Sequence, residues 1–337
     1  MKNRRRTLFF LIALPLFCSV RAEVTNSFYF TSSIMTRSLA MGGAFTAVRD
    51  AIESSFYNPA ALIEKEENFR VAVDPLGLVA LARGIERVSV RTSLTPTDYL
   101  AAAGMALRFV SFAYGPFQAT ALLSEELSSS PFRDLNDIQT AGEGIADWNH
   151  HIAAFRLTPA QQISLGASLL FFNLGEIGEG EFRIDRSIGS SYGILISPTY
   201  RFSVGATVFN LPQEARSAME SKYQVDRQDV NFGLSWLASE AIQLAMDFRK
   251  VTQEDSSDAV HFHGGVELTP FSFLALRAGY FHEKENKISA GFGLGQFRRL
   301  KRRDFIFGKI MLNYCLQTVT TNNQPNLEHR LALLIRL

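Results

Sequence analysis

Apolar and polar side chains alternate along most of the chain, and the alternation is clearest after residue 148. In residues 229–237 (DVNFGLSWL) the apolar residues Val230, Phe232, Leu234 and Trp236 alternate with Asp229, Asn231, Gly233 and Ser235. Residues 200–208, 241–249 and 286–295 repeat this arrangement. Successive side chains of a strand point to opposite faces. Each segment therefore predicts a β-strand with one apolar face and one polar, glycine-rich face.

The same pattern predicts eleven strands in the second part of the chain, at residues 148–157, 162–173, 189–197, 200–210, 228–237, 240–250, 259–268, 272–282, 286–296, 305–316 and 326–337. Three or four earlier strands are expected within residues 68–74, 86–94, 103–114 and 116–124. An even number of strands closes a bacterial barrel with both ends of the chain on the same side. We predict about fourteen strands, and the pattern also leaves about twelve or sixteen open.

Two architectures use strands of this kind. A soluble sandwich buries the apolar faces between two sheets, whereas a membrane barrel turns them towards lipid. Segments of about ten residues favour the barrel, because that length crosses a membrane when the strand is tilted. Short turns also alternate with long connections, as in outer-membrane barrels. The short turns are 157–161, 197–199, 237–240 and 268–271, and the long connections are 175–188, 211–227, 251–258 and 317–325. The predicted fold class is an all-β, transmembrane, antiparallel up-and-down β-barrel over residues 67–337.

The first 22 residues have the composition of a secretory signal peptide. A basic start precedes a short apolar run at residues 8–17, and the segment ends at Ala22 after small residues at the positions that signal peptidase reads. The alternative, a lipid anchor on Cys18, is weaker because Phe17 is bulky where lipid attachment needs a small residue. We expect cleavage at about Ala22 and a location in the outer membrane of a two-membrane bacterium.

Removal of this signal changes the charge of the chain. Five of the 34 basic residues lie in it, so 29 remain against 33 acidic residues, and the net charge is near −4. Nucleic acid is not an expected partner, because its binding requires a basic surplus. Of the two cysteines only Cys315 remains, so no internal disulfide is expected.

The segment between the signal and the first strand differs from the rest of the chain. Gly42 and Gly43 permit a tight bend or close packing. Asn58 is placed to cap a short helix that has Pro59 at its first position and continues through Ala60. A compact piece of this kind can fold back into the barrel. Residues 23–66 are therefore predicted to form a short helical plug, or hatch, in the lumen.

Two stretches resemble a known family. Residues 41–48 (MGGAFTAV) and 57–62 (YNPAAL) resemble the opening segment of the FadL-like outer-membrane barrels, which include long-chain fatty-acid transporters and the PorV-type proteins of a secretion system. Residues 261–280 are similar to a strand pair of the PorV-type branch, and the glycine-rich residues 291–295 fit the strand that follows. The resemblance implies a fourteen-stranded barrel with an N-terminal hatch. The chain departs from the family at Ala61, where glycine is usual, and at Leu337, where an aromatic residue is usual.

Charged residues on the predicted lumen faces are the candidates for binding. Arginine suits a carboxylate head group because its fork matches the carboxylate geometry, although mixed charges on opposing strands also pair with one another. The candidates are Arg91, Arg201, Asp247, Arg249, His261, His263, Glu267, Arg277, Lys287 and Lys309. His261, His263 and Glu267 share one strand face, so the two imidazoles could share a metal. The sequence does not establish a third ligand, and we expect no metal or other cofactor. No phosphate-binding loop is present, and no local Ser-His-acid set points to an enzyme.

The sequence therefore predicts a channel for small hydrophobic molecules, with long-chain fatty acids as the first candidate. Its expected partners are outer-membrane lipid, an apolar ligand and, during biogenesis, the barrel-assembly machinery. Two alternatives stay open: a PorV-like accessory barrel of a secretion system that binds exported proteins, and a structural surface-exposed protein.

Overall fold

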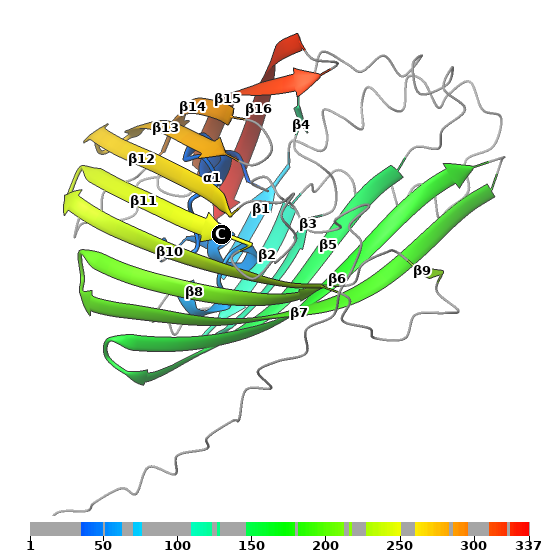
Figure 1. The fold of residues 1–337 in the computed structure, drawn as a ribbon, viewed down its shortest axis with the longest axis horizontal. Coiled ribbons are helices and arrows are strands. Elements are labelled where there is room, and N and C mark those ends of the chain that lie inside the picture. The colour runs from blue at the N-terminus through cyan, green and yellow to red at the C-terminus, as the bar shows by residue number, and fades with distance from the viewer. Residues whose placement is uncertain are drawn as a thin grey trace, which may run out of the picture.

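The chain folds as a closed antiparallel β-barrel (Figure 1). This computed structural model describes residues 35–49, 51–62, 70–75, 109–122, 127–128, 146–178, 181–211, 216–217, 227–250, 260–282, 286–295, 310–321 and 324–336. Sixteen strands form one sheet, and fourteen of them make up the ring, because β4 (Leu127–Ser128) and β9 (Arg216–Ser217) are two-residue additions to its edge. The predicted fold class and strand number are confirmed.

The strands of the ring follow one another in chain order. They are β1 (Arg70–Asp74), β2 (Phe109–Tyr114), β3 (Phe117–Leu122), β5 (Ala146–Ala160), β6 (Ile163–Gly178), β7 (Glu181–Thr199), β8 (Phe202–Leu211), β10 (Arg227–Ser239), β11 (Ile242–Arg249), β12 (His261–Phe271), β13 (Leu274–His282), β14 (Asn286–Leu294), β15 (Ile310–Thr321) and β16 (Gln324–Arg336). The ring closes where β1 pairs with β16 through Ala72 and Val73, and the Asp74 carboxylate accepts a hydrogen bond from the Leu333 amide at 3.2 Å.

The two faces of the wall have the polarity of a membrane barrel. On β10, Phe232 and Trp236 point outwards and are about half exposed, whereas Asn231 and Ser235 point inwards and are buried. An apolar outer face and a polar inner face is the reverse of a soluble protein, and it suits a wall that faces lipid. None of the helices in the described ranges is long and apolar enough to cross a membrane.

The largest difference from the sequence-based expectation lies between β6 and β7. Residues 175–188 were expected to form a long loop, but β6 continues to Gly178 and β7 begins at Glu181. These two strands are 16 and 19 residues long and project beyond their neighbours (Figure 1). β15 and β16 likewise continue into the connection expected at residues 317–325. The signal peptide and the strand expected at residues 86–94 lie outside the described residues.

Candidate functional site

The interior of the barrel holds residues 35–49 and 51–62, which we call the lumen segment. It contains the helix α1 (Thr36–Ala40) and two single turns of 3₁₀ helix, η1 (Ile52–Phe56) and η2 (Pro59–Ala61). Figure 1 shows α1 inside the ring of strands, and its backbone lies closest to β14 and β15. All described residues of the segment except Arg37 and Arg49 are buried. Such complete burial of so short a segment shows that the wall surrounds it.

Local sequence explains the bends of this segment. Gly42 and Gly43 have φ angles of 63° and 78°, a conformation that other residues rarely adopt, and they end α1. The Gly43 amide donates to the Ser38 carbonyl at 2.8 Å. At the other end, the Asn58 side chain accepts a hydrogen bond from the Ala60 amide at 2.9 Å and caps η2, with Pro59 at the first position.

A row of inward-facing glycines receives the segment. We call Gly166, Gly193, Gly205, Gly233, Gly265, Gly279 and Gly291 the glycine row, and they lie on β6, β7, β8, β10, β12, β13 and β14. A Cβ at any of these seven positions would come closer than 3.0 Å to an atom of the lumen segment. Three pairs within the row are direct cross-strand neighbours, namely Gly166 with Gly193, Gly205 with Gly233 and Gly265 with Gly279. The wall and the segment therefore approach each other closely on seven of the fourteen strands of the ring.

Asp247 on β11 holds the middle of the segment. Its carboxylate accepts hydrogen bonds from the Phe45 amide at 2.8 Å, the Thr46 amide at 3.0 Å and the Thr46 hydroxyl at 2.8 Å. Arg249, two residues further on the same strand face, lies 3.5 Å from this carboxylate and donates to the Gly43 carbonyl. A buried carboxylate requires such partners, because an unpaired charge in a dry interior is costly.

Glu267 on β12 holds α1. Arg37 donates to both of its carboxylate oxygens at 3.0 Å, in the bidentate geometry that arginine makes with carboxylates. Arg277 on β13 donates to the same carboxylate at 2.6 Å and to the Asn313 side chain at 2.9 Å. Burial alone would lower the pKa of Arg37, but the negative charges of Glu267 and Glu53 raise it above its ordinary value. Arg37 is therefore a permanent cation in this contact.

Wall side chains also bind the backbone of the segment at several other points. Gln118 donates to the Ile52 carbonyl at 3.0 Å, and Ser203 donates to the Ala47 carbonyl at 2.8 Å. Arg156 donates to the Leu62 carbonyl. Within the segment, the Asn58 side-chain amide donates to the Thr46 carbonyl at 2.9 Å. These bonds satisfy backbone groups of an irregular segment that is not hydrogen-bonded into the β-sheet.

Apolar packing fills the space between these polar anchors. Phe45, Val48 and Phe56 of the segment form one buried cluster with wall residues that include Phe109 and Leu170. The rings of Phe56 and Phe109 lie 6.5 Å apart, and those of Phe45 and Tyr57 lie 5.4 Å apart. Burial of one such ring stabilises the fold by about 1.5–3 kcal/mol. At the level of the segment the lumen is thus a packed apolar core with polar contacts at its edge.

The structure brings most of the predicted site residues together. The proposed hatch residues Gly42, Gly43, Asn58, Pro59 and Ala60 are buried in the segment, and Asp247, Arg249, His261, His263, Glu267 and Arg277 are buried inward-facing residues of the wall. Lys287 is half-buried, with its ammonium 5.4 Å from the centre of the Phe281 ring.

Arg201 does not lie in the lumen. It is exposed in the turn between β7 and β8, where its guanidinium bonds to the Tyr200 hydroxyl at 2.6 Å, so the predicted inward position is wrong for this residue. The strand ends before it, and the alternation cannot be continued through a turn. Arg91 and Lys309 lie outside the described residues.

His263 of β12 contacts both the lumen segment and a neighbouring strand of the wall. The Nδ1 atom of His263 lies 2.7 Å from the Gly42 carbonyl oxygen, and its ring stacks on Phe281 with centres 5.5 Å apart. In the described part of the chain, no group of three or more His, Cys, Asp or Glu side chains could hold a metal ion.

Several residues of the site were not predicted from the sequence. Arg37, Thr46, Gln118 and Arg156 had no signal of their own, because their partners are brought near only by the path of the segment. The glycine row did carry a signal. Glycine recurs at inward positions on many strands, and a glycine inside a strand commonly marks the close approach of another backbone.

Comparison with protein-family models finds no match, and comparison with curated proteins finds none either. Solved structures do resemble this one. The toluene transporter TbuX of Ralstonia pickettii superposes with a TM-score of 0.54 at 11% identity, covering 91% of this chain and 98% of TbuX. The TodX deltaS2S3 mutant monoaromatic hydrocarbon channel gives 0.51 at 11% identity, covering 91% and 98% of the two chains. The CymD monoaromatic hydrocarbon channel gives 0.50 at 12% identity, covering 90% and 96%.

These similarities span almost the whole of each chain. At such low identity they establish a shared fold. The resemblance noted in the sequence is therefore supported at the level of fold.

Proposed function

We propose that this protein is an outer-membrane channel for small hydrophobic molecules and that the lumen segment is its hatch. The packed apolar cluster at the level of the segment carries the proposal. A hydrated ion or sugar would have to give up its water to enter such a core, whereas an apolar molecule would not. The fold shared with TbuX, described as a toluene transporter, and with CymD, described as a monoaromatic hydrocarbon channel, supports the same function.

Two classes of cargo fit this proposal. The sequence resemblance suggests long-chain fatty acids, and the names of the structural neighbours suggest monoaromatic hydrocarbons. Two inward arginines that could anchor a carboxylate head group already bind oxygen atoms of the protein. Arg277 binds those of Glu267 and Asn313. Arg249 binds the Gly43 carbonyl and lies beside the Asp247 carboxylate. This arrangement favours an uncharged apolar molecule, with long-chain fatty acids as the second candidate.

Gating in this proposal involves the segment. Asp247 and Glu267 hold it from the wall, and the bends at Gly42, Gly43 and Asn58–Pro59 are the places where its backbone can change direction. A passage opens when part of the segment moves away from these anchors. No such movement requires the strands to separate.

Uptake by cells tests the proposal. The full chain is produced in a two-membrane host that lacks its own channels for hydrophobic molecules, and entry of labelled toluene and of a labelled long-chain acid is measured. We expect faster entry of at least one of them than with an empty vector. In planar bilayers the purified barrel should be closed to ions, and a variant lacking residues 38–62 should conduct them.

The rival function is the PorV-like accessory role, which the sequence similarity at residues 261–280 favours. A folded barrel that raises the uptake of neither cargo would refute the transport proposal and favour this rival. Unchanged conductance after deletion of residues 38–62 would refute the hatch alone.

A further inference from the structure

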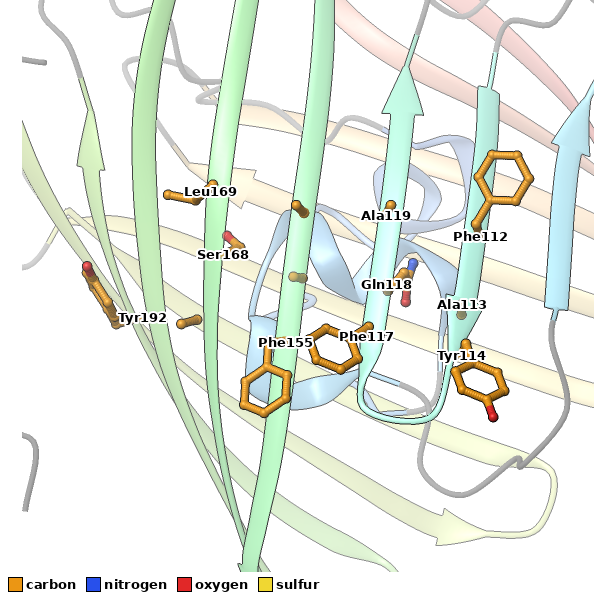
Figure 2. A pocket seen from close by; sticks show the side chains of 13 residues that line it. Phe112, Ala113, Tyr114, Phe117, Gln118, Ala119, Phe155, Ser168, Leu169 and Tyr192 are labelled. Carbon is orange, nitrogen blue, oxygen red and sulfur yellow. The ribbon is translucent and has the colours of Figure 1, made fainter. Parts of the chain in front are cut away.

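The outer face of the wall is hollowed across β3, β5 and β6. Most outward positions carry large apolar side chains, but Ala119, Ala153 and Ala167 occupy three neighbouring ones. Ala119 pairs directly with Ala153, and Ala167 pairs with Phe155, two residues further along β5. The three alanines line a depression with a volume of about 530 Å³, which we call the wall groove, and we call the area between them its floor; Ala119 is labelled in Figure 2.

Aromatic rings surround this floor. Phe117 and Phe155 stand at one end with their centres 4.8 Å apart, and Phe112, Tyr114, Leu169 and Tyr192 complete the rim (Figure 2). Tyr114 and Phe117 are 61% and 58% exposed, so much of each side chain is accessible to another molecule. Among the residues that the structure describes, those that line the groove include no charged side chain.

The wall behind the groove is intact. β3 pairs with β5 without interruption from Phe117 to Leu122, and β5 pairs with β6 without interruption from Ala146 to Leu157. Gln118 and Ala154 also line the groove, but both are buried residues whose side chains are engaged on the inner side, where Gln118 bonds to the lumen segment and Ala154 belongs to the buried cluster. The groove is therefore a surface on the outside of the barrel and not an opening through it.

We propose that the wall groove binds a small planar apolar molecule, of one or two aromatic rings, that is dissolved in the membrane. The groove is continuous with the outward apolar face of the barrel, so its occupant comes from the lipid phase. Aromatic side chains attract further rings through offset and edge-to-face contacts. The volume lies within the range of small-molecule sites, about 300–1,000 Å³.

The size of the floor favours a ring over a lipid chain. Three adjacent strands lie about 4.8 Å apart, so the floor is about 10 Å across. This matches one or two fused rings, whereas an acyl chain of a membrane lipid would extend well beyond it. A role of this site as a reservoir of cargo rests on the proposed transport of hydrophobic molecules. Binding at the site does not depend on transport and is tested separately.

Photolabelling tests the site directly. The full-length mature barrel is reconstituted in phosphatidylcholine vesicles and labelled with a phenyl diazirine, and labelled residues are located by mass spectrometry. We expect labelling of residues 112–119, 153–155 and 167–169 that an excess of naphthalene removes. Labelling elsewhere on the outer face should not respond to naphthalene.

Filling the floor gives the decisive variant. Ala153→Leu should lower the competed labelling about tenfold, because it occupies the space against which the ring packs. Ala278→Leu, at an exposed outward alanine of β13, is the matched control and should leave the labelling unchanged. The melting temperature of each variant shows whether the barrel is folded.

Three outcomes would overturn the proposal. They are labelling of the groove that naphthalene does not compete, equal labelling in Ala153→Leu, and competition by dodecane but not by naphthalene, which would assign the groove to alkyl chains. Competed labelling together with no cellular uptake would retain the site and reject the transport function.

Discussion

Gly279 of the barrel wall lies directly against Gly42 of the lumen segment, so closely that a Cβ on Gly279 would overlap the Gly42 nitrogen. The two residues are more than two hundred positions apart in the chain and come from different parts of the fold. Their contact is at backbone distance, with no side chain from either residue between them. The fit of the segment therefore depends on the absence of a single methyl group in β13.

Gly279→Ala should displace the segment from the wall. Overpacking of a tightly packed interior costs about 1–3 kcal/mol, and here the neighbouring atoms are backbone and cannot rotate away. We expect a lower melting temperature and a rise in ion conductance in planar bilayers. Gly264→Ala is the control, because a Cβ there would meet only the Phe262 ring at 3.4 Å. Closed, fully stable Gly279→Ala barrels would contradict this account of the glycine row.

Asp247→Asn should loosen the middle of the segment. The substitution removes the negative charge that accepts from Phe45 and Thr46 and that neutralises Arg249. Loss of one partner of a buried ion pair costs about 3–5 kcal/mol. The change is measured as a shift in thermal unfolding followed by circular dichroism in detergent. Glu240→Gln, in the exposed turn before β11, provides the control and should unfold like the unmodified protein.

The two ends of the Arg37–Glu267 contact should differ in their response to substitution. Glu267→Gln leaves Arg37 and Arg277 facing each other without an anion between them, whereas Arg37→Gln leaves Glu267 paired with Arg277. We therefore expect Glu267→Gln to destabilise the barrel more than Arg37→Gln, by about 1–3 kcal/mol. Unfolding of both single variants and of the double variant gives the coupling energy. Equal effects of the two single substitutions would argue against a shared carboxylate.

Arg201→Ala should have little effect on either stability or uptake. Its side chain is exposed in a turn, and surface substitutions of this kind usually change stability by less than about 0.5 kcal/mol. Arg277→Ala, at a buried inward position, should lower the melting temperature clearly. Both variants are compared in the same uptake and unfolding experiments. A strong loss of uptake in Arg201→Ala alone would give this turn a role that its position does not suggest.

The strands could be predicted from the sequence wherever the wall faces lipid. In β10, Phe232 and Leu234 alternate with Gly233 and Ser235, and this pattern predicts which face of the strand is outside. In the structure Phe232 and Leu234 are exposed on the outer face. The signal weakens in residues 175–188, because glycine and charged residues dominate the stretch and leave only the short alternation of Phe182, Ile184 and Ile188. Composition there is typical of a loop, although the backbone is paired.

The candidate site could be predicted only in part, for a similar reason. Period-2 alternation places Asp247 and Glu267 on the inner face, since only the strand geometry is needed. Their partners Thr46 and Arg37 lie in a segment with no period, and its path depends on the whole ring. The sequence therefore indicates the anchors on the wall but not what they hold.

The glycine row also has a consequence for evolution. A substitution at the glycines of β12, β13 or β14 is constrained by the lumen segment, which lies far from these strands in the sequence, so the two stretches cannot change independently. Related barrels that keep the segment should keep glycine at the positions of Gly265 and Gly279, and relatives that have lost it should accept larger residues there. If the lumen segment and these glycines are lost together in some relatives, their distribution among lineages would show when the segment was gained or lost.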